Sequence, residues 1–225
     1  MIIEICCDSL EKALSARQAG AGRIELCVEL AVGGVTPPRD LMEQAFRTMQ
    51  IPVHVLVRPR SGDFRYTPEE VGQMLDTIRQ VGELSENSRA EGRNVPRDGV
   101  VIGALDGAGE VDAEVCRRLI RLSRTLRLSV TFHRAIDVAK DPLQAFRDIL
   151  PLRVDRVLSS GGAASAYEGR KTLARMQEIT RAEHGPVLMP GAGVTAANVG
   201  DILRATGASE IHGSRIEIIR GAALA

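Results

Sequence analysis

Short aliphatic runs rich in β-branched residues alternate with longer amphipathic stretches along the chain. Each run ends in a polar or glycine turn, which a helix-capping residue and an amphipathic segment then follow. This alternation predicts parallel strands that are joined by right-handed helical crossovers. The eight predicted strands are Ile2–Cys6, Arg23–Cys27, Pro52–Val57, Val100–Gly103, Leu128–Phe132, Val154–Leu158, Val187–Met189 and Glu210–His212.

Capping residues mark the predicted helix starts. A proline that follows Thr or Asp suits the first position of a helix, and side-chain oxygens of Thr and Asp accept the free N–H groups there. The prolines in this position are Pro37, Pro68 and Pro142. The pairs with capping-box or similar spacing are Asp8 with Glu11, Thr67 with Glu70, and Asp141 with Gln144, and further predicted caps are Asp112 and Thr195.

The charged residues inside the predicted strands distinguish a closed barrel from an open sheet. Glu4 shares strand parity with Cys6, and Glu25 shares it with Cys27, so each pair lies on one face of its strand. An open sheet covered by helices has nearly pure aliphatic central strands. A barrel can hold polar groups inside near its mouth. We therefore predict one α/β domain over residues 1–225, an eight-stranded parallel (β/α)8 TIM barrel whose chemistry lies at the strand C-termini.

One polar stretch, Ser85–Asp98, lies between a predicted helix and the next strand. It is predicted to be a surface loop on the N-terminal face without a catalytic role, because residues on that face of a barrel stabilise the fold whereas active sites lie on the opposite face.

Charge and composition narrow the classes of partner. Lys+Arg and Asp+Glu are both 29, so the net charge of zero predicts neither a nucleic-acid nor a membrane partner. No apolar run approaches the roughly 18 residues that a membrane span needs. The N-terminus lacks the pattern of a signal peptide, so we expect a cytoplasmic protein.

The 4 cysteines form no CxxC pair and are expected to be thiols.

Two kinds of segment after the strands are candidates for anion binding. Arg58 and Arg60 flank a proline, and arginine forks suit carboxylate or phosphate, although both could equally form structural ion pairs. Glycine turns expose backbone N–H groups that favour anions, although such turns are also common in tight loops. The glycines concerned are Gly161, Gly162, Gly191 and Gly193.

Acid–base chemistry has several candidate groups at the same end of the predicted barrel. His133 titrates near neutrality and has Asp137 close by, although this pair could also be structural. Glu25 and Asp63 are further candidates for proton transfer. The other polar residues predicted at the mouth are Glu4, Asp8, Arg134, Glu210 and His212.

Cys6 and Cys27 allow a metal site. They end neighbouring predicted strands about 4.8 Å apart, and two thiolates suit a soft ion such as Cu(I), although two buried thiols explain the residues as well.

The sequence does not support two other catalytic mechanisms. A Schiff-base aldolase needs a lysine on a strand, and none of the lysines lies there. The GxSxG nucleophile elbow is also missing.

The motifs together resemble those of the CutC family, over residues 2 to about 214. The matching segments are Glu4-Ile5-Cys6, Arg23–Cys27, Gly33–Pro37, His54–Phe64 with Tyr66, Thr131–Ala135 with Asp137, Ser160–Gly162, Pro190–Gly193 with Asn198, and Glu210–His212.

This resemblance implies a TIM barrel, a cytoplasmic location, a homo-oligomer (dimer or tetramer) and a role in copper homeostasis. Cu(I) is then the implied ligand, held by Cys6 and Cys27. The polar mouth also suits an enzyme that acts on a small anionic metabolite, such as a phosphorylated one, so an enzymatic role stays open. Compared with the family the chain ends early after His212, which predicts a short or incomplete final helix.

Overall fold

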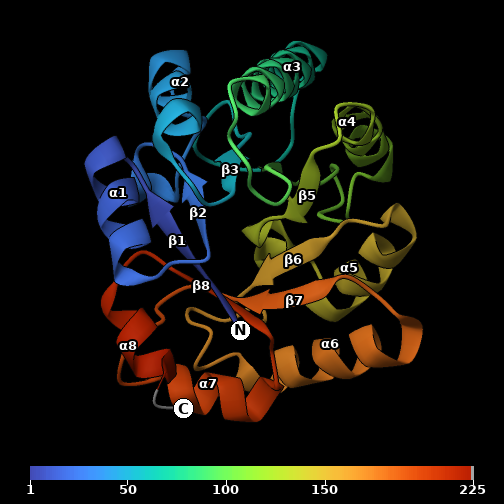
Figure 1. The fold of residues 1–225 in the computed structure, drawn as a ribbon. Helices are drawn as coiled ribbons and strands as arrows, with labels where there is room; N and C mark the ends of the chain where they lie inside the picture. Colours follow the sequence, from blue (N-terminus) through green and yellow to red (C-terminus); the bar gives the residue numbers. More distant parts are fainter. Residues whose placement is uncertain (224–225) are drawn as a thin grey trace.

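The computed structural model describes residues 1–223, and its strands form one ring (Figure 1). All neighbouring strands pair in parallel, in the order β7-β6-β5-β4-β3-β2-β1-β8, and β8 lies beside β7. The strands are β1 (Ile2–Cys7), β2 (Arg23–Leu26), β3 (Val53–Leu56), β4 (Gly99–Ile102), β5 (Ser129–Phe132), β6 (Arg156–Ser159), β7 (Val187–Pro190) and β8 (Glu210–Gly213). Each predicted strand is confirmed to within two residues, and so is the eight-stranded parallel barrel.

Helices surround this ring on the outside, as Figure 1 shows. The α-helices are α1 (Leu10–Ala19), α2 (Arg39–Thr48), α3 (Pro68–Ala90), α4 (Ala113–Thr125), α5 (Pro142–Ile149), α6 (Arg170–Glu183), α7 (Val199–Thr206) and α8 (Glu217–Ala223). Three short 3-10 helices are η1 (Leu30–Val32), η2 (Arg134–Val138) and η3 (Leu150–Leu152). The final helix is short, as predicted. Over residues 1–223, none of the helices has the length and apolar character that crossing a membrane requires.

Three of the predicted helix caps are confirmed. Thr67 and Glu70 form a reciprocal capping box at the start of α3. The Asp141 carboxylate accepts backbone N–H groups at the start of α5, and Asp112 does the same for α4. Each of these side chains satisfies donors that the first turn of a helix leaves free.

Two other predicted caps are displaced along the chain. Ser9, not Asp8, caps α1, because the Asp8 carboxylate lies 2.7 Å from Lys12 Nζ instead. Thr195 does not begin α7, whose cap position is Asn198; the Asn198 Oδ1 atom accepts the Thr195 N–H at 2.8 Å.

Pro37 does not open a helix either. Pro38 occupies the cap position of α2 and the helix begins at Arg39, because the extended backbone of Pro38 delays the first turn.

The prediction of a loop over Ser85–Asp98 is wrong in its first half, because α3 continues to Ala90. Ser85 is buried there, and its hydroxyl donates to Asp98 Oδ2 at 2.8 Å. Arg93 binds the same carboxylate at 2.7 Å. This buried cluster joins the end of α3 to the start of β4, so the segment stabilises the N-terminal face.

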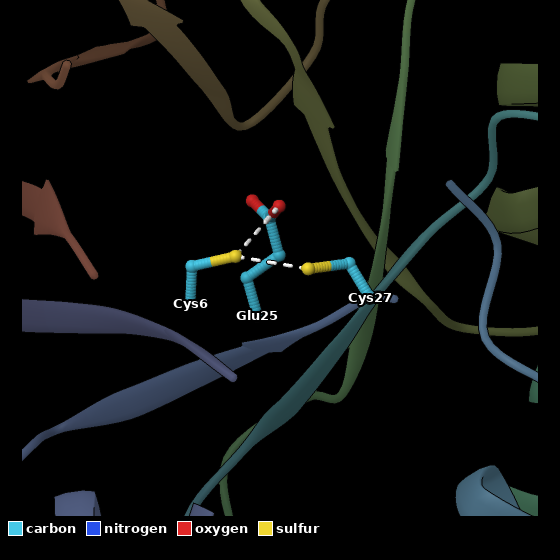
Figure 2. Close-up of side chains that lie close together, drawn as sticks. All are labelled: Cys6, Glu25 and Cys27. Carbon is cyan, nitrogen blue, oxygen red and sulfur yellow. Dashed lines mark hydrogen bonds between the residues drawn. The ribbon is translucent and has the colours of Figure 1, made fainter. Parts of the chain in front are cut away.

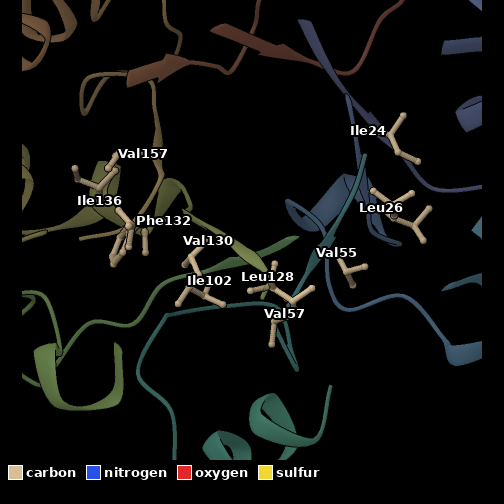
Figure 3. Close-up of a cluster of buried hydrophobic side chains, with 14 of the residues drawn as sticks. Ile24, Leu26, Val55, Val57, Ile102, Leu128, Val130, Phe132, Ile136 and Val157 are labelled. Atoms are coloured by element: carbon tan, nitrogen blue, oxygen red, sulfur yellow. The ribbon is translucent and has the colours of Figure 1, made fainter. Parts of the chain in front are cut away.

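The apolar core lies between the outer face of the barrel and the helices (Figure 3). Ile24 and Leu26 of β2 point outward into this layer, whereas their neighbours Arg23 and Glu25 point inward. The outer face is therefore aliphatic and close-packed, and the barrel interior keeps the polar groups that the alternating pattern predicted.

Candidate functional site

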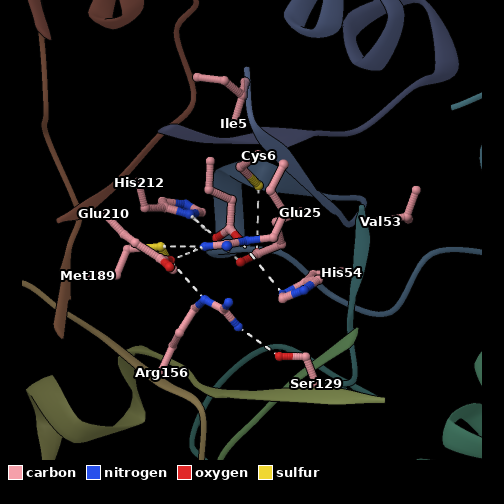
Figure 4. A network of polar contacts seen from close by, with 12 residues as sticks. Ile5, Cys6, Glu25, Val53, His54, Ser129, Arg156, Met189, Glu210 and His212 are labelled. Atoms are coloured by element: carbon pink, nitrogen blue, oxygen red, sulfur yellow. Dashed lines mark hydrogen bonds and ion pairs between the residues drawn. The ribbon is translucent and has the colours of Figure 1, made fainter. Parts of the chain in front are cut away.

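Four charged side chains pair with one another inside the barrel and are here called the paired layer: Glu4, Arg23, Arg156 and Glu210. Three of them are buried, whereas the side chain of Arg156 is 18% exposed. Figure 4 shows Arg156 and Glu210 with their neighbours. Arg23 binds Glu4 through Nε and Glu210 through Nη2. Arg156 Nε lies 2.8 Å from Glu210 Oε2, and its Nη1 donates to Ser129 Oγ at 2.7 Å. Glu4 and Glu210 were predicted at the mouth. The structure places them below it, within this layer.

The charges of the paired layer are mutually compensated. Burial disfavours the charge on Glu4, but Arg23 and the hydrogen bond from His212 outweigh it and hold the pKa of Glu4 far below its usual range. Burial also disfavours the charge on Arg23, yet Glu4 and Glu210 raise the pKa of this guanidinium. A buried charge with close partners stays ionised, so this layer is a set of internal ion pairs.

Two histidines border the paired layer. His212 Nδ1 lies 2.8 Å from Glu4 Oε1. Burial opposes the charge on His212, but this hydrogen bond and Glu25 raise its pKa. His54 Nδ1 lies 3.8 Å from Glu4 and makes no hydrogen bond. Burial and the nearby Arg23 lower the pKa of His54 to about 3, so its ring is neutral.

Above this layer a cavity of about 490 Å³ opens at the C-terminal ends of the strands. Its walls include four buried polar side chains, here called the mouth layer: Cys6, Glu25, Arg58 and His133. Apolar side chains and the loops after β7 and β8 complete the walls. They include Leu30, Val32, Phe64, Val138, Leu158, Gly193, Ser214 and Arg215.

Glu25 lies in the wall of this cavity with an incomplete set of partners. Its Oε2 atom is buried and has no hydrogen-bond partner among the described residues, and its closest cation, His212 Nδ1, is 3.9 Å away. Burial and the neighbouring Glu4 raise the pKa of Glu25 to about 7, against the opposing effect of His212. A carboxyl group in this condition exchanges its proton readily near neutral pH.

Arg58 and His133 pack against the same aromatic ring. The Arg58 guanidinium carbon lies 4.8 Å from the centre of Phe64, and the His133 ring lies 4.9 Å from it, centre to centre. Arg58 donates to the carbonyl oxygens of Val32, Gly34 and Gly62, so the outer guanidinium nitrogens hold loops in place. The Nε atom of Arg58 and Nε2 of His133 have no partner within residues 1–223.

The two predicted metal ligands lie next to each other (Figure 2), and of the two Cys6 lines the cavity while Cys27 is fully buried. Cys6 Sγ lies 3.0 Å from Cys27 Sγ and 3.8 Å from Glu25 Oε1. The hydrogen bond with Cys27, together with burial, raises the pKa of the Cys6 thiol well above its usual range. The three side chains could hold one ion, and two sulfur donors fit a soft metal such as Cu(I).

Several predicted site residues are outside the cavity wall. Arg60 is occupied by Glu70 at 2.6 Å and by Asp63 at 2.9 Å, and Asp63 is exposed. Asp8 pairs with Lys12 on the surface. Arg134 does line the cavity, where it lies 2.9 Å from Asp137.

The glycine turn after β6 is already filled by protein acceptors. The Asp137 carboxylate accepts the N–H groups of Ser160 and Gly162, and Ser159 Oγ accepts that of Gly161. Asp137 therefore shapes this loop, and its carboxylate occupies the position where we expected an external anion.

The turn after β7 is only partly occupied. The Gly191 N–H donates to the Ser159 carbonyl. Gly193 lines the cavity, and its N–H donates to no acceptor in the described part of the chain.

Sequence reasoning missed several cavity residues. Phe64, Ser214 and Arg215 lie in loops that directly follow β3 and β8, so their position after a strand was an available signal. Ala192, also in the wall, adopts a φ of 83°, which is uncommon for a residue other than glycine. Nothing local in the sequence indicates that backbone conformation.

Comparisons with known proteins agree on one family. The model of the CutC family matches residues 1–217. A CutC family protein of Xylella fastidiosa is 41% identical over 217 residues, which cover 96% of this chain and 76% of the relative. The mouse copper homeostasis protein cutC homolog is 42% identical over 211 residues, covering 94% of this chain and 72% of the relative.

Solved structures show the same fold. A CutC protein from Streptococcus agalactiae superimposes with a TM-score of 0.82 at 29% identity, covering 96% of this chain and 99% of that one. Deoxyribose phosphate aldolase from Aeropyrum pernix gives a TM-score of 0.67 at 12% identity over 97% of this chain and 88% of that one, a likeness of fold alone. Together with the match over nearly the whole sequence, these findings show that the chain belongs to the CutC family.

Proposed function

We propose that this chain serves copper homeostasis by binding Cu(I) through Cys6 and Cys27. The observation that carries the proposal is the 3.0 Å approach of the two sulfur atoms, of which Cys6 belongs to the cavity wall. Thiolates are the side chains that Cu(I) prefers. Both thiols must lose their protons on binding, so the affinity should rise with pH. The names of the mouse and human relatives agree with this function.

The test is an anaerobic competition titration with Cu(I) and a chromogenic Cu(I) chelator. We expect the wild-type chain to hold one ion, and the Cys6→Ala/Cys27→Ala variant to lose it. Cys116→Ala is the matched control, because this thiol is also buried but lies on α4, on the outside of the barrel. Equal Cu(I) binding by the wild type and the double variant would refute the proposal.

A second candidate function is an enzyme that acts on a small anionic metabolite within the same cavity. The observation in its favour is that three residues of the cavity wall, Glu25, Arg58 and His133, each have one buried polar atom without a partner among residues 1–223. Buried polar groups in proteins are nearly always paired, so unpaired ones beside a cavity suit a ligand. Arg215 and the Gly193 N–H lie in the same wall and suit the anionic group of that ligand.

Calorimetric titration with inorganic phosphate tests this second candidate, because phosphate is the simplest probe of the anion position. We expect saturable binding that Arg215→Gln weakens about 10-fold, the equivalent of one lost charge-assisted hydrogen bond. Arg79→Gln is the control, because Arg79 is exposed and pairs with Asp76 on α3. If phosphate binds equally to all three proteins, or to none, the anion position is wrong.

A further inference from the structure

The side chain of His133 is fixed in one tautomer. Its Nδ1 atom accepts the backbone N–H of Ala135 at 3.2 Å, so the ring proton must be on Nε2. Burial and the nearby Arg58 lower the pKa of His133 to about 3, and the ring is therefore neutral at physiological pH. Because Nε2 has no acceptor within residues 1–223, the ring offers one unused N–H donor beside the cavity.

Arg58 offers a second unused donor of the same kind. Both of its outer nitrogens donate to backbone carbonyls, which holds the guanidinium in place, and Nε is the one nitrogen of this group that has no partner among the described residues. Arg58 and His133 both pack on Phe64, so the two unused N–H groups come from neighbouring positions on one wall. A carbonyl oxygen has two lone pairs and accepts two such donors.

Glu25 supplies the opposite chemistry from another part of the wall. It belongs to β2, and β3 and β4 separate that strand from β5, which His133 directly follows. Its unpartnered Oε2 is an acceptor, whereas the unpartnered atoms of Arg58 and His133 are donors. The cavity wall therefore carries an acceptor on Glu25 and two fixed donors on Arg58 and His133.

We propose that the cavity binds a small α-hydroxy carbonyl compound with an anionic end, and moves a proton between its carbonyl carbon and the carbon beside it. The inference rests on the second candidate function and names its substrate class. The carbonyl oxygen accepts the N–H groups of His133 and Arg58. Glu25 takes the proton from the neighbouring carbon, the electron pair of that C–H bond forms a C=C bond to the carbonyl carbon, and the π electron pair of the carbonyl moves to its oxygen.

The resulting enediolate carries its negative charge on the oxygen that the two donors hold. Fixed donors of this kind stabilise such a charge because they need no reorientation when it develops. Glu25 then returns the proton to the former carbonyl carbon, and the oxygens exchange one proton, so atoms and electrons balance and no further reactant is needed. The lysines of the chain, Lys12, Lys140 and Lys171, are exposed and absent from the cavity wall, so the substrate carbonyl is polarised by hydrogen bonds without forming an imine.

The test follows exchange of carbon-bound hydrogen in D2O by proton NMR. The probes are dihydroxyacetone phosphate, glyceraldehyde 3-phosphate and the two unphosphorylated parent compounds. With wild-type protein we expect loss of the C–H signal next to the carbonyl, faster for the phosphorylated member of each pair. Absence of exchange above the buffer rate for all four compounds would overturn the proposal.

Matched variants identify the groups. Glu25→Gln should slow the exchange at least 100-fold, whereas Glu86→Gln, an exposed change on α3, should leave it unaltered. His133→Phe should slow it about 100-fold, and His133→Gln, which keeps an N–H donor, should recover part of that loss. Circular dichroism checks that each variant is folded. Equal exchange in His133→Phe and His133→Gln would contradict the assignment of a donor.

The same samples separate this inference from the candidate function on which it rests. If phosphate binds and Arg215→Gln weakens it, but no probe exchanges its hydrogen, the anion-binding enzyme stands and the carbonyl chemistry fails. If neither phosphate binding nor exchange occurs, both fail. The Cu(I) titration is independent of either result.

Discussion

The barrel interior contains two polar layers that differ in how completely their partners are supplied. In the paired layer, both arginines contact carboxylates within 3 Å, and no water or ligand is needed to neutralise them. In the mouth layer, Glu25, Arg58 and His133 each have one buried polar atom without a partner in the described part of the chain. The two layers share β1 and β2, each of which carries one residue of either layer.

This difference distinguishes buried polar groups that support the fold from those that are available to a ligand. A buried ion pair whose partners are complete is compatible with a stable fold, whereas each unpaired buried group costs about 1–3 kcal/mol. The mouth layer retains that cost beside a cavity that a ligand can enter. We therefore expect changes in the paired layer to destabilise the protein, and changes in the mouth layer to affect its chemistry more than its fold.

The largest expected effect is that of Arg23→Met. The substitution leaves the buried carboxylates of Glu4 and Glu210 without their shared cation, which should lower the free energy of unfolding by about 3–5 kcal/mol. Urea denaturation at pH 7 measures this change. A loss below about 1 kcal/mol would show that the paired layer does not support the fold.

Glu25→Gln should have the opposite effect and raise the free energy of unfolding. The folded-state pKa of Glu25 is raised from 4.5 to about 7, so the carboxyl disfavours folding once the pH passes through that interval. Removing it should raise the free energy of unfolding by up to about 3 kcal/mol at pH 8 and have little effect at pH 4. Urea denaturation at both pH values, with Glu86→Gln as control, checks the result. A loss of stability at pH 8 would instead place Glu25 among the structural ion pairs.

A smaller, pH-dependent effect is expected from His133. Its pKa is lowered from 6.5 to about 3 in the folded chain, so the unfolded chain binds more protons between these values. The contribution of this neutral ring to the free energy of unfolding is therefore present above pH 6.5 and is lost as the pH falls toward 3. At pH 5 the loss from this residue should reach about 2 kcal/mol. Comparing wild type with His133→Gln by urea denaturation at pH 7, 6 and 5 should show a shallower decline in the variant; parallel declines would contradict a neutral buried ring.

The smallest effect should come from Arg60→Gln. The Arg60 side chain is 38% exposed and pairs with Asp63 and Glu70 at the rim, outside the cavity wall. Exposed ion pairs contribute about 1 kcal/mol or less. We expect a change in unfolding free energy within that range and unchanged phosphate binding. A 10-fold loss of phosphate affinity would show that Arg60 does take part in binding the anion.

Much of the fold was predictable because the signals are local. Strand and helix periodicity gave all eight strands, and the period of two placed Glu4, Glu25 and His212 on the inner face of the barrel. Helix caps were less certain, since Ser9 and Asn198 compete with neighbouring residues for the same position. The extent of α3 was missed because its polar last turns are held by Asp98, which follows them in the chain but pairs through the fold.

Which side chains enter the barrel could be worked out from the order of residues, because alternation along a strand depends only on residues next to one another. Which of these side chains are neutralised depends on the folded arrangement of the strands. Glu4 lies opposite Arg23 and Cys6 lies opposite Glu25, since the register of β1 against β2 brings them together. The Asp137 carboxylate likewise fills the turn at Gly162 from another loop. Pairing of this kind depends on contacts between distant segments, so no local pattern distinguishes a paired carboxylate from one that is free to react.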